Sequence, residues 1–253
     1  VVHVTRDVGP FARKRLEQVR AALAEIDVEL VTHPGMFAVD SLSVIQTGTG
    51  NPYTVFTPFW RNWSGQSRRD VVGAPRSVPA PNDRVARGQL PALSALGLEQ
   101  EAEDPAPGGE AAARVALERF ITGPIGDYKD GRNTLTGESV SRLSPYLHFG
   151  CLSPREIEAR LPPGAGSAAF HRQLCWRDFY AHVLGHFPAN AKSEFQQRYR
   201  GTIRWSHAEK RFEAWCEGRT GYPSVDAGMR QLRREGWVHN RARLIVGSFL
   251  TKD

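Results

Sequence analysis

Residues 168–187, AAFHRQLCWRDFYAHVLGHF, decide how the second half of this chain folds. Their apolar side chains recur at helical spacing and predict one long helix with a buried face. The core candidates are Phe170, Leu174, Val183, Leu184 and Phe187. A second stripe at i, i+3, i+4 and i+7 combines an amide, an indole, a guanidinium and a phenol, which belong to Gln173, Trp176, Arg177 and Tyr180. The stripe either packs on a neighbouring helix, with an interior salt bridge, or lines a binding site.

Helical patterns follow one another from Ala111 onward. Ser153-Pro154-Arg155-Glu156 combines a cap residue, a proline at the first helical position and a glutamate three residues after the cap, which predicts a helix start. SVDAGMRQLRREG (224–236) predicts a helix that ends at Gly236, and Asn240 is a candidate cap for a last helix through Leu250. Residues 111–253 therefore predict a mainly α-helical domain.

The first residues show a different pattern. VVHV (1–4) and VELVTHP (28–34) are strand-like, and a helical pattern, FARKRLEQVRAALAEI (11–26), lies between them. Strand, helix, strand predicts one βαβ unit of an α/β domain over residues 1–63. Two strands do not form a stable sheet alone, and no methionine opens the chain, so we expect the chain to begin inside a domain. Residues 64–110, rich in Pro, Gly, Ser and Ala, predict an interdomain linker.

Composition narrows the class of protein. The 253 residues are 40% hydrophobic and 24% charged, which is ordinary for a globular protein, and neither a membrane-length apolar run nor a signal peptide is expected. Three widely spaced cysteines without a CxxC pair, Cys151, Cys175 and Cys216, argue against a disulfide scaffold and against a zinc site. We therefore expect a protein of the reducing cytoplasm, without a metal and without a membrane partner.

The net charge of +6 is unevenly distributed. Residues 1–110 hold 11 Lys and Arg against 13 Asp and Glu, whereas residues 111–253 hold 22 against 14. The basic half also contains Trp176, Trp205, Trp215 and Trp237. Basic surface with interleaved aromatics suits a polyanion with stackable bases, and a solvated basic face over buried tryptophans is the alternative.

Several stretches together resemble the cryptochrome/DNA photolyase family. They are SRLSPYLHFGCLSPRE (141–156), RQLCWRDFYAHVL (172–184), AWCEGRTGYPSVDAGMRQLRREGWVHNRARL (214–244) and SFLTKD (248–253). VTRDVGPFARKR (4–15) and YTVFTPFWRNW (53–63) resemble the end of the family's antenna domain. The resemblance implies a Rossmann-like α/β antenna domain, incomplete here, followed by an incomplete helical FAD-binding domain. Most of the antenna domain is absent, so the antenna chromophore, of the folate or the deazaflavin type, stays open.

The implied activity is that of a deoxyribodipyrimidine photo-lyase, a flavoprotein and carbon–carbon lyase of DNA repair. Blue light excites reduced FAD, which donates an electron to a cyclobutane pyrimidine dimer in UV-damaged DNA. The damaged dinucleotide is flipped out of the duplex, and its poor pairing lowers the cost. The resemblance also implies a monomer.

The resemblance assigns FAD contacts residue by residue. They are Tyr128, Val140, Ser141, Arg142, Leu143, Ser144, Phe170, Arg177 and Arg243. Residues 140–144 match the segment that grips the flavin phosphates, and hydroxyls with free amides at a helix start suit an anion. Val140 departs from the pattern, because a hydroxyl residue is common there, and we expect one phosphate hydrogen bond to be lost.

A second set of residues faces DNA in the family. It comprises Arg132, Gln173, Trp176, Arg177, Tyr180, Asn240 and Arg241. Trp176 would stack on the flipped dimer, and Trp205 matches the outermost tryptophan of the chain that photoreduces the flavin. Gln173, Trp176 and Trp205 are thus the expected catalytic residues. Gln173 replaces the glutamate of many dimer-repairing members; it can hydrogen-bond a pyrimidine carbonyl but cannot hold a proton.

The family pattern extends beyond both ends of this chain, so we expect the chain to be partial and inactive by itself. Two alternatives stay open. The neutral Gln173 leaves room for a cryptochrome-like photoreceptor that binds flavin without repairing DNA. The partial match leaves room for a flavin-free basic helical module that binds nucleic acid. The lesion, a cyclobutane dimer or a (6-4) product, is also open.

Overall fold

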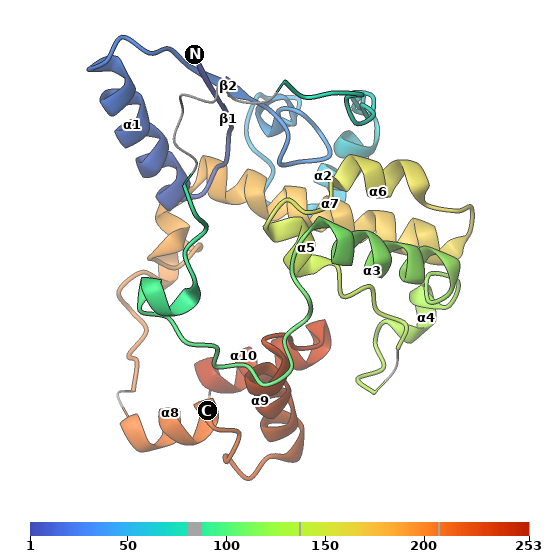
Figure 1. The fold of residues 1–253 in the computed structure, drawn as a ribbon. Helices are drawn as coiled ribbons and strands as arrows, with labels where there is room; N and C mark the ends of the chain where they lie inside the picture. Colours follow the sequence, from blue (N-terminus) through green and yellow to red (C-terminus); the bar gives the residue numbers. More distant parts are fainter. Residues whose placement is uncertain (80–87, 137, 207, 253) are drawn as a thin grey trace. The chain divides into compact units, whose positions relative to one another are not determined.

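A computed structural model describes residues 1–79, 88–136, 138–206 and 208–252, and Figure 1 shows the order of their helices and strands. The chain forms two compact units, of which the first joins Val1–Val71 to Gly108–Trp205 and the second joins Val72–Pro107 to Ser206–Asp253. Each unit is described by itself. No helix of the described ranges is long and apolar enough to cross a membrane.

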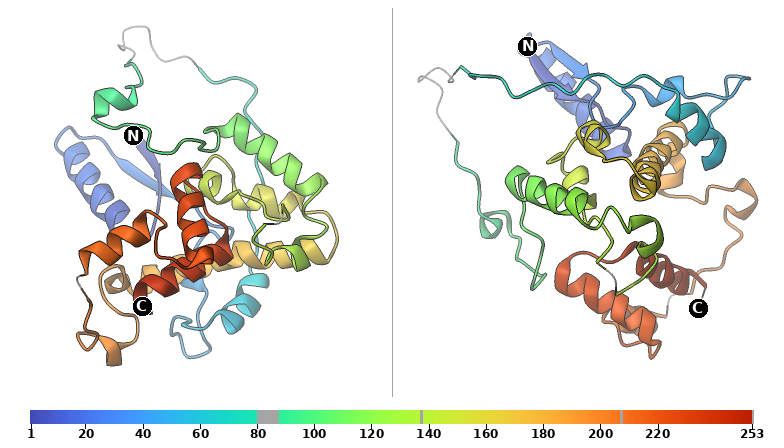
Figure 2. Two further views of the ribbon diagram at one scale, coloured as in Figure 1. Left: turned by 90° about the horizontal axis from the view of Figure 1, so that it is seen from below. Right: turned by 90° about the vertical axis from the view of Figure 1, so that its right-hand side faces the viewer.

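The βαβ unit predicted from the N-terminal pattern is confirmed. Strands β1 (Val2–Thr5) and β2 (Leu30–His33) form a parallel pair in which Val2 lies opposite Leu30. Helix α1 (Pro10–Ala24) connects them, and Figure 2 shows it beside the two strands from two further sides. The described part of the chain contains only this two-stranded sheet, so the structure shows a parallel βαβ unit and no larger Rossmann-like sheet.

The rest of the first unit is mainly helical. Among its described residues, the short 3₁₀ helix η1 (Leu42–Val44) is followed by six α-helices and by two more 3₁₀ helices, η3 (Pro188–Ala191) and η4 (Gln197–Tyr199). The α-helices are α2 (Phe56–Ser64), α3 (Glu110–Thr122), α4 (Tyr128–Gly131), α5 (Ser144–His148), α6 (Pro154–Arg160) and α7 (Ala165–His186). Helix α7 contacts both α2 and α4, so it connects the two hydrophobic cores of this unit.

The two cores differ in composition. The aliphatic core, named after its most numerous side chains, surrounds the first part of α7 and contains Leu117, Leu143, Ile157 and Leu174; it also holds buried aromatic rings, those of Phe120, Tyr128, Tyr146 and Phe170. The aromatic core surrounds the second part and gathers side chains from residues 38–63 and from α7, among them Phe56, Phe59, Trp63 and Phe179. Two polar side chains, Asp178 and His182, are almost completely buried beside the aromatic core.

The predicted start of α6 is confirmed, but its capping chemistry is different. Ser153 occupies the cap position with an extended backbone, and Pro154 is the first helical residue. The Ser153 hydroxyl makes no capping hydrogen bond to the described backbone. The Glu156 carboxylate instead accepts a hydrogen bond from Arg114 Nη1 at 2.7 Å, because α3 passes beside α6. A contact between helices therefore replaces the expected reciprocal cap.

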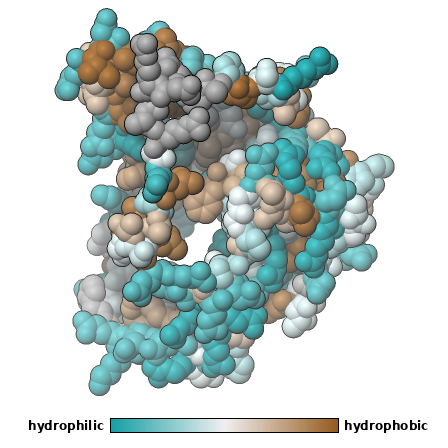
Figure 3. All heavy atoms as spheres, viewed as in Figure 1, coloured by the Kyte–Doolittle hydropathy of each residue, from teal (hydrophilic) through white to brown (hydrophobic). Residues whose placement is uncertain are grey.

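The second unit contains η2 (Leu93–Leu96), α8 (Glu209–Cys216), α9 (Pro223–Glu235) and α10 (Asn240–Lys252). The predicted end of α9 is confirmed, because Gly236 has a left-handed backbone with φ of 62°. The backbone N–H of Asp104 donates to the Arg234 carbonyl at 2.8 Å and so satisfies one carbonyl at this helix end. Hydrophilic side chains predominate over α8 and α9 in Figure 3.

The predicted domain boundaries at residues 63 and 110 do not coincide with the two units. The predicted linker, residues 64–110, is divided between them, and residues 80–87 of it lie outside the described ranges. The three-part domain division therefore stays a prediction.

Candidate functional site

The candidate site is built on α7, a helix of 22 residues. Phe170 and Leu174 on one side of the helix enter the aliphatic core, and Cys175 and Phe179 enter the aromatic core. Burying these residues leaves the predicted polar–aromatic stripe at the boundary of the core. Gln173, Trp176 and Arg177 are half-buried, and Tyr180 is 65% exposed. The stripe is therefore partly accessible to a ligand.

The Trp176 indole has one face covered by protein. Its ring is parallel to the Phe56 ring, with centroids 3.7 Å apart and planes 3° apart. Phe179 meets Trp176 edge-on, with centroids 5.5 Å apart. Tyr180, one helical turn later, lies 5.5 Å from the indole at 30°. Tyr180 is mostly exposed and Trp176 is half-buried, so this part of the stripe is partly accessible.

Arg177 ties three parts of the first unit together. Its Nη1 donates to the Met36 carbonyl at 2.5 Å, and its Nη2 approaches the Leu147 carbonyl at 3.4 Å. Burial lowers the pKa of this guanidinium, and the neighbouring Asp178 opposes that shift. Two N–H donors of Arg177 are therefore already directed at backbone carbonyls. The contacts of Arg177 with FAD and DNA stay predictions.

Asp178 lies beneath the stripe and is fully buried. Its Oδ2 accepts hydrogen bonds from Trp63 Nε1 at 2.9 Å and from the backbone N–H groups of Ala38 and Val39 at 3.0 and 3.4 Å. Desolvation raises the pKa of this carboxyl to about 6, although these donors favour the charged form. Asp178 thereby joins α7 to α2 and to residues 38 and 39.

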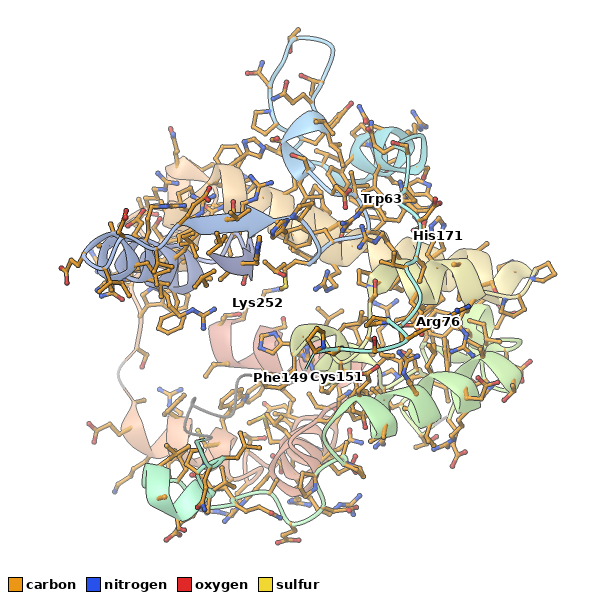
Figure 4. All side chains as sticks on the ribbon, turned by 45° about the horizontal axis from the view of Figure 1, so that its top comes forward. Trp63, Arg76, Phe149, Cys151, His171 and Lys252 are labelled. Atoms are coloured by element: carbon orange, nitrogen blue, oxygen red, sulfur yellow. The ribbon has the colours of Figure 1, made fainter. Side chains whose placement is uncertain are left out.

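His171 adds a half-buried ion-pair network above Trp63. Its Nε2 contacts Glu158 Oε1, and Arg68 Nε donates to the other Glu158 oxygen at 3.0 Å. These partners lower the pKa of Glu158 against the opposing effect of its own desolvation. The Trp63 and His171 rings lie 5.1 Å apart, and both are labelled in Figure 4. Cys175 is buried here, and desolvation raises the pKa of its thiol, which disfavours the reactive thiolate.

The predicted phosphate-binding segment lies beside α4. A Cβ atom on Gly131 would overlap Ser139 Oγ, so α4 is in direct contact with Ser139, the residue that precedes the segment. Ser141 Oγ accepts a hydrogen bond from the Leu143 backbone at 3.3 Å, which leaves its own proton to donate. Arg142 has a left-handed backbone, with φ of 53°, and is exposed, as is Ser144. Leu143 is fully buried, and Val140 is half-buried.

Tyr128 and Phe170 are predicted FAD contacts that the structure brings together. Their rings meet edge-to-face with centroids 5.2 Å apart, and both residues are buried in the aliphatic core. Arg132 lies over the Tyr128 ring at 5.9 Å, and its buried Nε has no hydrogen-bond partner among the described residues. An unsatisfied guanidinium N–H is costly unless an acceptor binds it. The Arg132 donor fits a phosphate acceptor, and, separately, the hydroxyls of Ser141 and Ser144 fit a phosphate-bearing group such as FAD.

The remaining predicted site residues are all exposed. Trp205 ends the first unit with 53% of its surface exposed, and Asn240, Arg241 and Arg243 occupy the first turn of α10 in the second unit. Their roles beside the flavin and DNA stay predictions. The described ranges hold no cluster of three or more His, Cys, Asp or Glu side chains that could hold a metal ion.

Comparison with known proteins identifies the family. Residues 1–82 match the family model described as DNA photolyase, and residues 170–253 match the model described as FAD binding domain of DNA photolyase. A deoxyribodipyrimidine photo-lyase of Streptomyces griseus is 42% identical over 254 residues, which cover 99% of this chain. The chain belongs to the cryptochrome/DNA photolyase family. FAD is the cofactor that this assignment gives to its helical part.

Solved structures of the photolyase family have the same fold. A bacterial class III photolyase from Agrobacterium tumefaciens matches 99% of this chain with a TM-score of 0.87 and 32% identity. A cryptochrome from Synechocystis matches 98% with a TM-score of 0.85 and 26% identity. An archaeal photolyase from Sulfolobus tokodaii, solved with two FAD molecules, matches with a TM-score of 0.77 and 29% identity.

The chain spans about half the length of the photolyases that it matches. It covers 54% of the Streptomyces griseus protein and 54% of the Agrobacterium structure. The predicted likeness to this family is confirmed, whereas the activity, substrate and partners of the whole protein are matters for proposal.

The residues that hold the stripe in place were not predicted from the sequence. Phe56, Asp178 and His182 are all buried, and each contacts a segment more than 100 residues away in the sequence. One signal was available, because Phe56, Phe59 and Trp63 recur at helical spacing and predict an aromatic buried face. That pattern does not reveal that the face packs on α7.

Proposed function

We propose that this chain belongs to a deoxyribodipyrimidine photo-lyase that splits cyclobutane pyrimidine dimers in UV-damaged DNA with blue light. The observation that carries the proposal is the aromatic pair of the α7 stripe, in which the half-buried Trp176 lies parallel to Phe56 and is followed one turn later by the exposed Tyr180. Stacking on an aromatic ring contributes about 1–3 kcal/mol per base, which is comparable with the cost of flipping a damaged base. The curated relatives with this name support the choice of reaction.

FAD, when bound in its reduced form, supplies the light-excited electron for the reaction. Ser141, Arg142 and Ser144 would hold its phosphate groups, with Tyr128 and Phe170 beside them. Gln173 would orient a pyrimidine by a hydrogen bond to its carbonyl. Arg132, Asn240 and Arg241 would bind DNA phosphates, which adds affinity without sequence preference. Trp205 is exposed and would serve as the outer electron donor.

We also propose that the βαβ unit belongs to the family's antenna domain and that the protein acts as a cytoplasmic monomer. The match of residues 1–82 to the photolyase model and the parallel pairing of β1 and β2 support the first statement. Three free cysteines support a reducing compartment.

A cryptochrome-like photoreceptor is the second candidate. Gln173 favours it, because an amide cannot hold a proton near the dimer. The likeness to the Synechocystis cryptochrome adds support, although at lower identity than the photolyases.

The deciding experiment uses the protein that carries this chain, loaded with reduced FAD. A duplex with a single thymine dimer is illuminated with blue light, and dimer loss is followed by chromatography of the digested DNA. We expect light-dependent repair, and we expect Trp176→Ala to weaken binding of the dimer duplex by about tenfold or more while undamaged duplex is bound nearly as before. Absence of repair despite bound, reduced FAD would favour the photoreceptor. Equal losses on both duplexes would remove the stacking role.

A further inference from the structure

Phe56 makes an aromatic contact that differs from the others around it. It is the first residue of α2, is only 7% exposed, and lies parallel to Trp176 at 3.7 Å. Phe179 meets Phe56 and Trp176 edge-on, at 80° and 83°. Edge-on rings fill space, whereas a parallel ring at van der Waals distance closes one whole face of its partner. The Phe56 ring therefore defines the plane of the indole.

Further contacts fix Phe56 itself. The Arg172 guanidinium lies 5.4 Å from the Phe56 centroid and 5.8 Å from that of Trp60, within cation–π range. Arg172 precedes Trp176 by one helical turn, so α7 holds the stack from two positions. Phe56 also belongs to the buried aromatic core, in which side chains have few alternative rotamers.

We propose that Phe56 is a positioning residue that acts through Trp176. It holds the indole plane in the orientation in which Trp176 would stack on an unpaired pyrimidine. This inference rests on the proposed function, because it concerns how Trp176 meets the flipped base. A tryptophan that is ordered in advance does not lose side-chain freedom when the base arrives, so the binding of a flipped base is stronger. Undamaged duplex presents no flipped base and does not gain from the same ordering.

The test compares Phe56→Leu with a matched control, Phe59→Leu. Phe59 lies on the same helix and is fully buried in the same core, and its ring contacts are with Tyr53, Phe179 and His182. Both changes remove an aromatic ring from the core, and only the first removes a ring that lies against Trp176. The holoprotein is titrated with a dimer-containing duplex and with undamaged duplex. The readout is the dissociation constant for undamaged duplex divided by that for the dimer-containing duplex, so a lower ratio means a weaker preference for damaged DNA.

We expect Phe56→Leu to lower this ratio about three- to tenfold, which is the gain expected from ordering one large side chain. Phe59→Leu should leave it within about twofold, although both variants lose stability. Phe56→Tyr, which keeps the ring, should restore the ratio. A Phe59→Leu loss equal to that of Phe56→Leu would overturn the proposal and show a general core effect.

A double-mutant cycle separates this proposal from the proposed function. In a Trp176→Leu background, Phe56→Leu should have no further effect on the ratio, because the residue through which it acts is absent. A further loss there would show that Phe56 acts by another route. If Trp176→Leu lowers the ratio and Phe56→Leu does not, the positioning role is refuted and the stacking site stands. If Trp176→Leu leaves the ratio unchanged, the stacking site fails and the positioning role fails with it.

Discussion

The two parts of α7 pack in different ways. The first part enters an aliphatic core in which buried side chains such as Leu117, Ile157 and Leu174 meet with little polar content. The second part enters an aromatic core that encloses a carboxylate, Asp178, and an imidazole, His182. Ion pairs around the first core, such as Arg114 with Glu110 and Glu156, lie at its surface. The first part of α7 is thus held mainly by apolar packing, and the second part also by buried hydrogen bonds.

This difference corresponds to the position of the candidate site. Apolar packing resists changes in volume but imposes no bond direction, because dispersion is non-directional. Hydrogen bonds to a buried carboxylate fix orientation, because donors and acceptor must align. The stripe residues Trp176 and Tyr180 lie on the part of α7 that is held in this second way. The hydrogen bonds to Asp178 therefore constrain the orientation of this part of α7.

Removing the buried carboxylate gives the largest expected effect. Asp178→Ala leaves Trp63 Nε1 and the N–H groups of Ala38 and Val39 without their acceptor, in a site closed to water. We expect the free energy of unfolding, from urea titration, to fall by roughly 3–5 kcal/mol. Asp178→Asn is the control, because its amide oxygen still accepts from one or two donors, and it should lose less. Equal losses in the two variants would show that charge, and not hydrogen bonding, is decisive.

The helices were predictable from the sequence, and their partners were not. The periodicity of residues 168–187 and the terminator Gly236 predicted α7 and the end of α9 within a few residues, because both signals are local. The pairing of Phe56 with Trp176 and of Asp178 with Ala38 joins segments more than 100 residues apart. No local pattern encodes such a pairing. The residues of the stripe were therefore predictable, and the distant residues that pack against them were not.

The site assignment depended on resemblance for a similar reason. Tyr128 and Phe170 have no local feature that marks a cofactor contact, and the structure buries both in the aliphatic core. Arg132 is different, because its orphaned Nε is a physical signal of a missing acceptor. That signal requires coordinates, since it depends on which groups surround the guanidinium. Sequence reasoning could name Arg132 only by analogy.

The two ends of α7 should differ in how well they accept a larger side chain, and the expected effect is smaller than that of Asp178→Ala. A Cβ atom on Gly166 would lie 1.8 Å from the Ile125 carbonyl oxygen, which is backbone and cannot move aside alone. We expect Gly166→Ala to cost about 1–3 kcal/mol by displacing the chain at Ile125. Differential scanning calorimetry or urea titration measures the loss.

Gly185→Ala is the matched control on the same helix. A Cβ there would meet Val8 Cγ1 at 3.5 Å, an ordinary contact. Because alanine favours helix over glycine, this variant should be unchanged or more stable by about 0.5–1 kcal/mol. Similar destabilisation of both variants would contradict the view that the aliphatic end is in close contact with a fixed loop.

The smallest expected effect is a pH dependence confined to the aromatic core. His182 Nε2 accepts the Tyr53 backbone N–H at 3.1 Å, which fixes the neutral tautomer with Nδ1–H donating to the Leu42 carbonyl at 3.1 Å. Burial lowers the pKa of His182 below its ordinary value of 6.5, and the nearby His186 lowers it further. The unfolded chain therefore binds more protons, so this contribution to stability is complete above pH 6.5 and is lost as the pH falls.

Asp178 acts with the opposite sign in the same core. Its pKa is raised from 3.8 to about 6, so the folded state binds more protons and its contribution to stability is lost as the pH rises through that window. The wild type alone therefore shows a partial cancellation between pH 4 and 6. The His182→Gln variant isolates the contribution of His182: the unfolding free energy of the wild type minus that of this variant should fall as the pH is lowered from 7 to 5. The unfolding free energy of the wild type minus that of Asp178→Asn should rise over the same range. If both differences have the same sign, then buried charge is not what distinguishes the aromatic core from the aliphatic one.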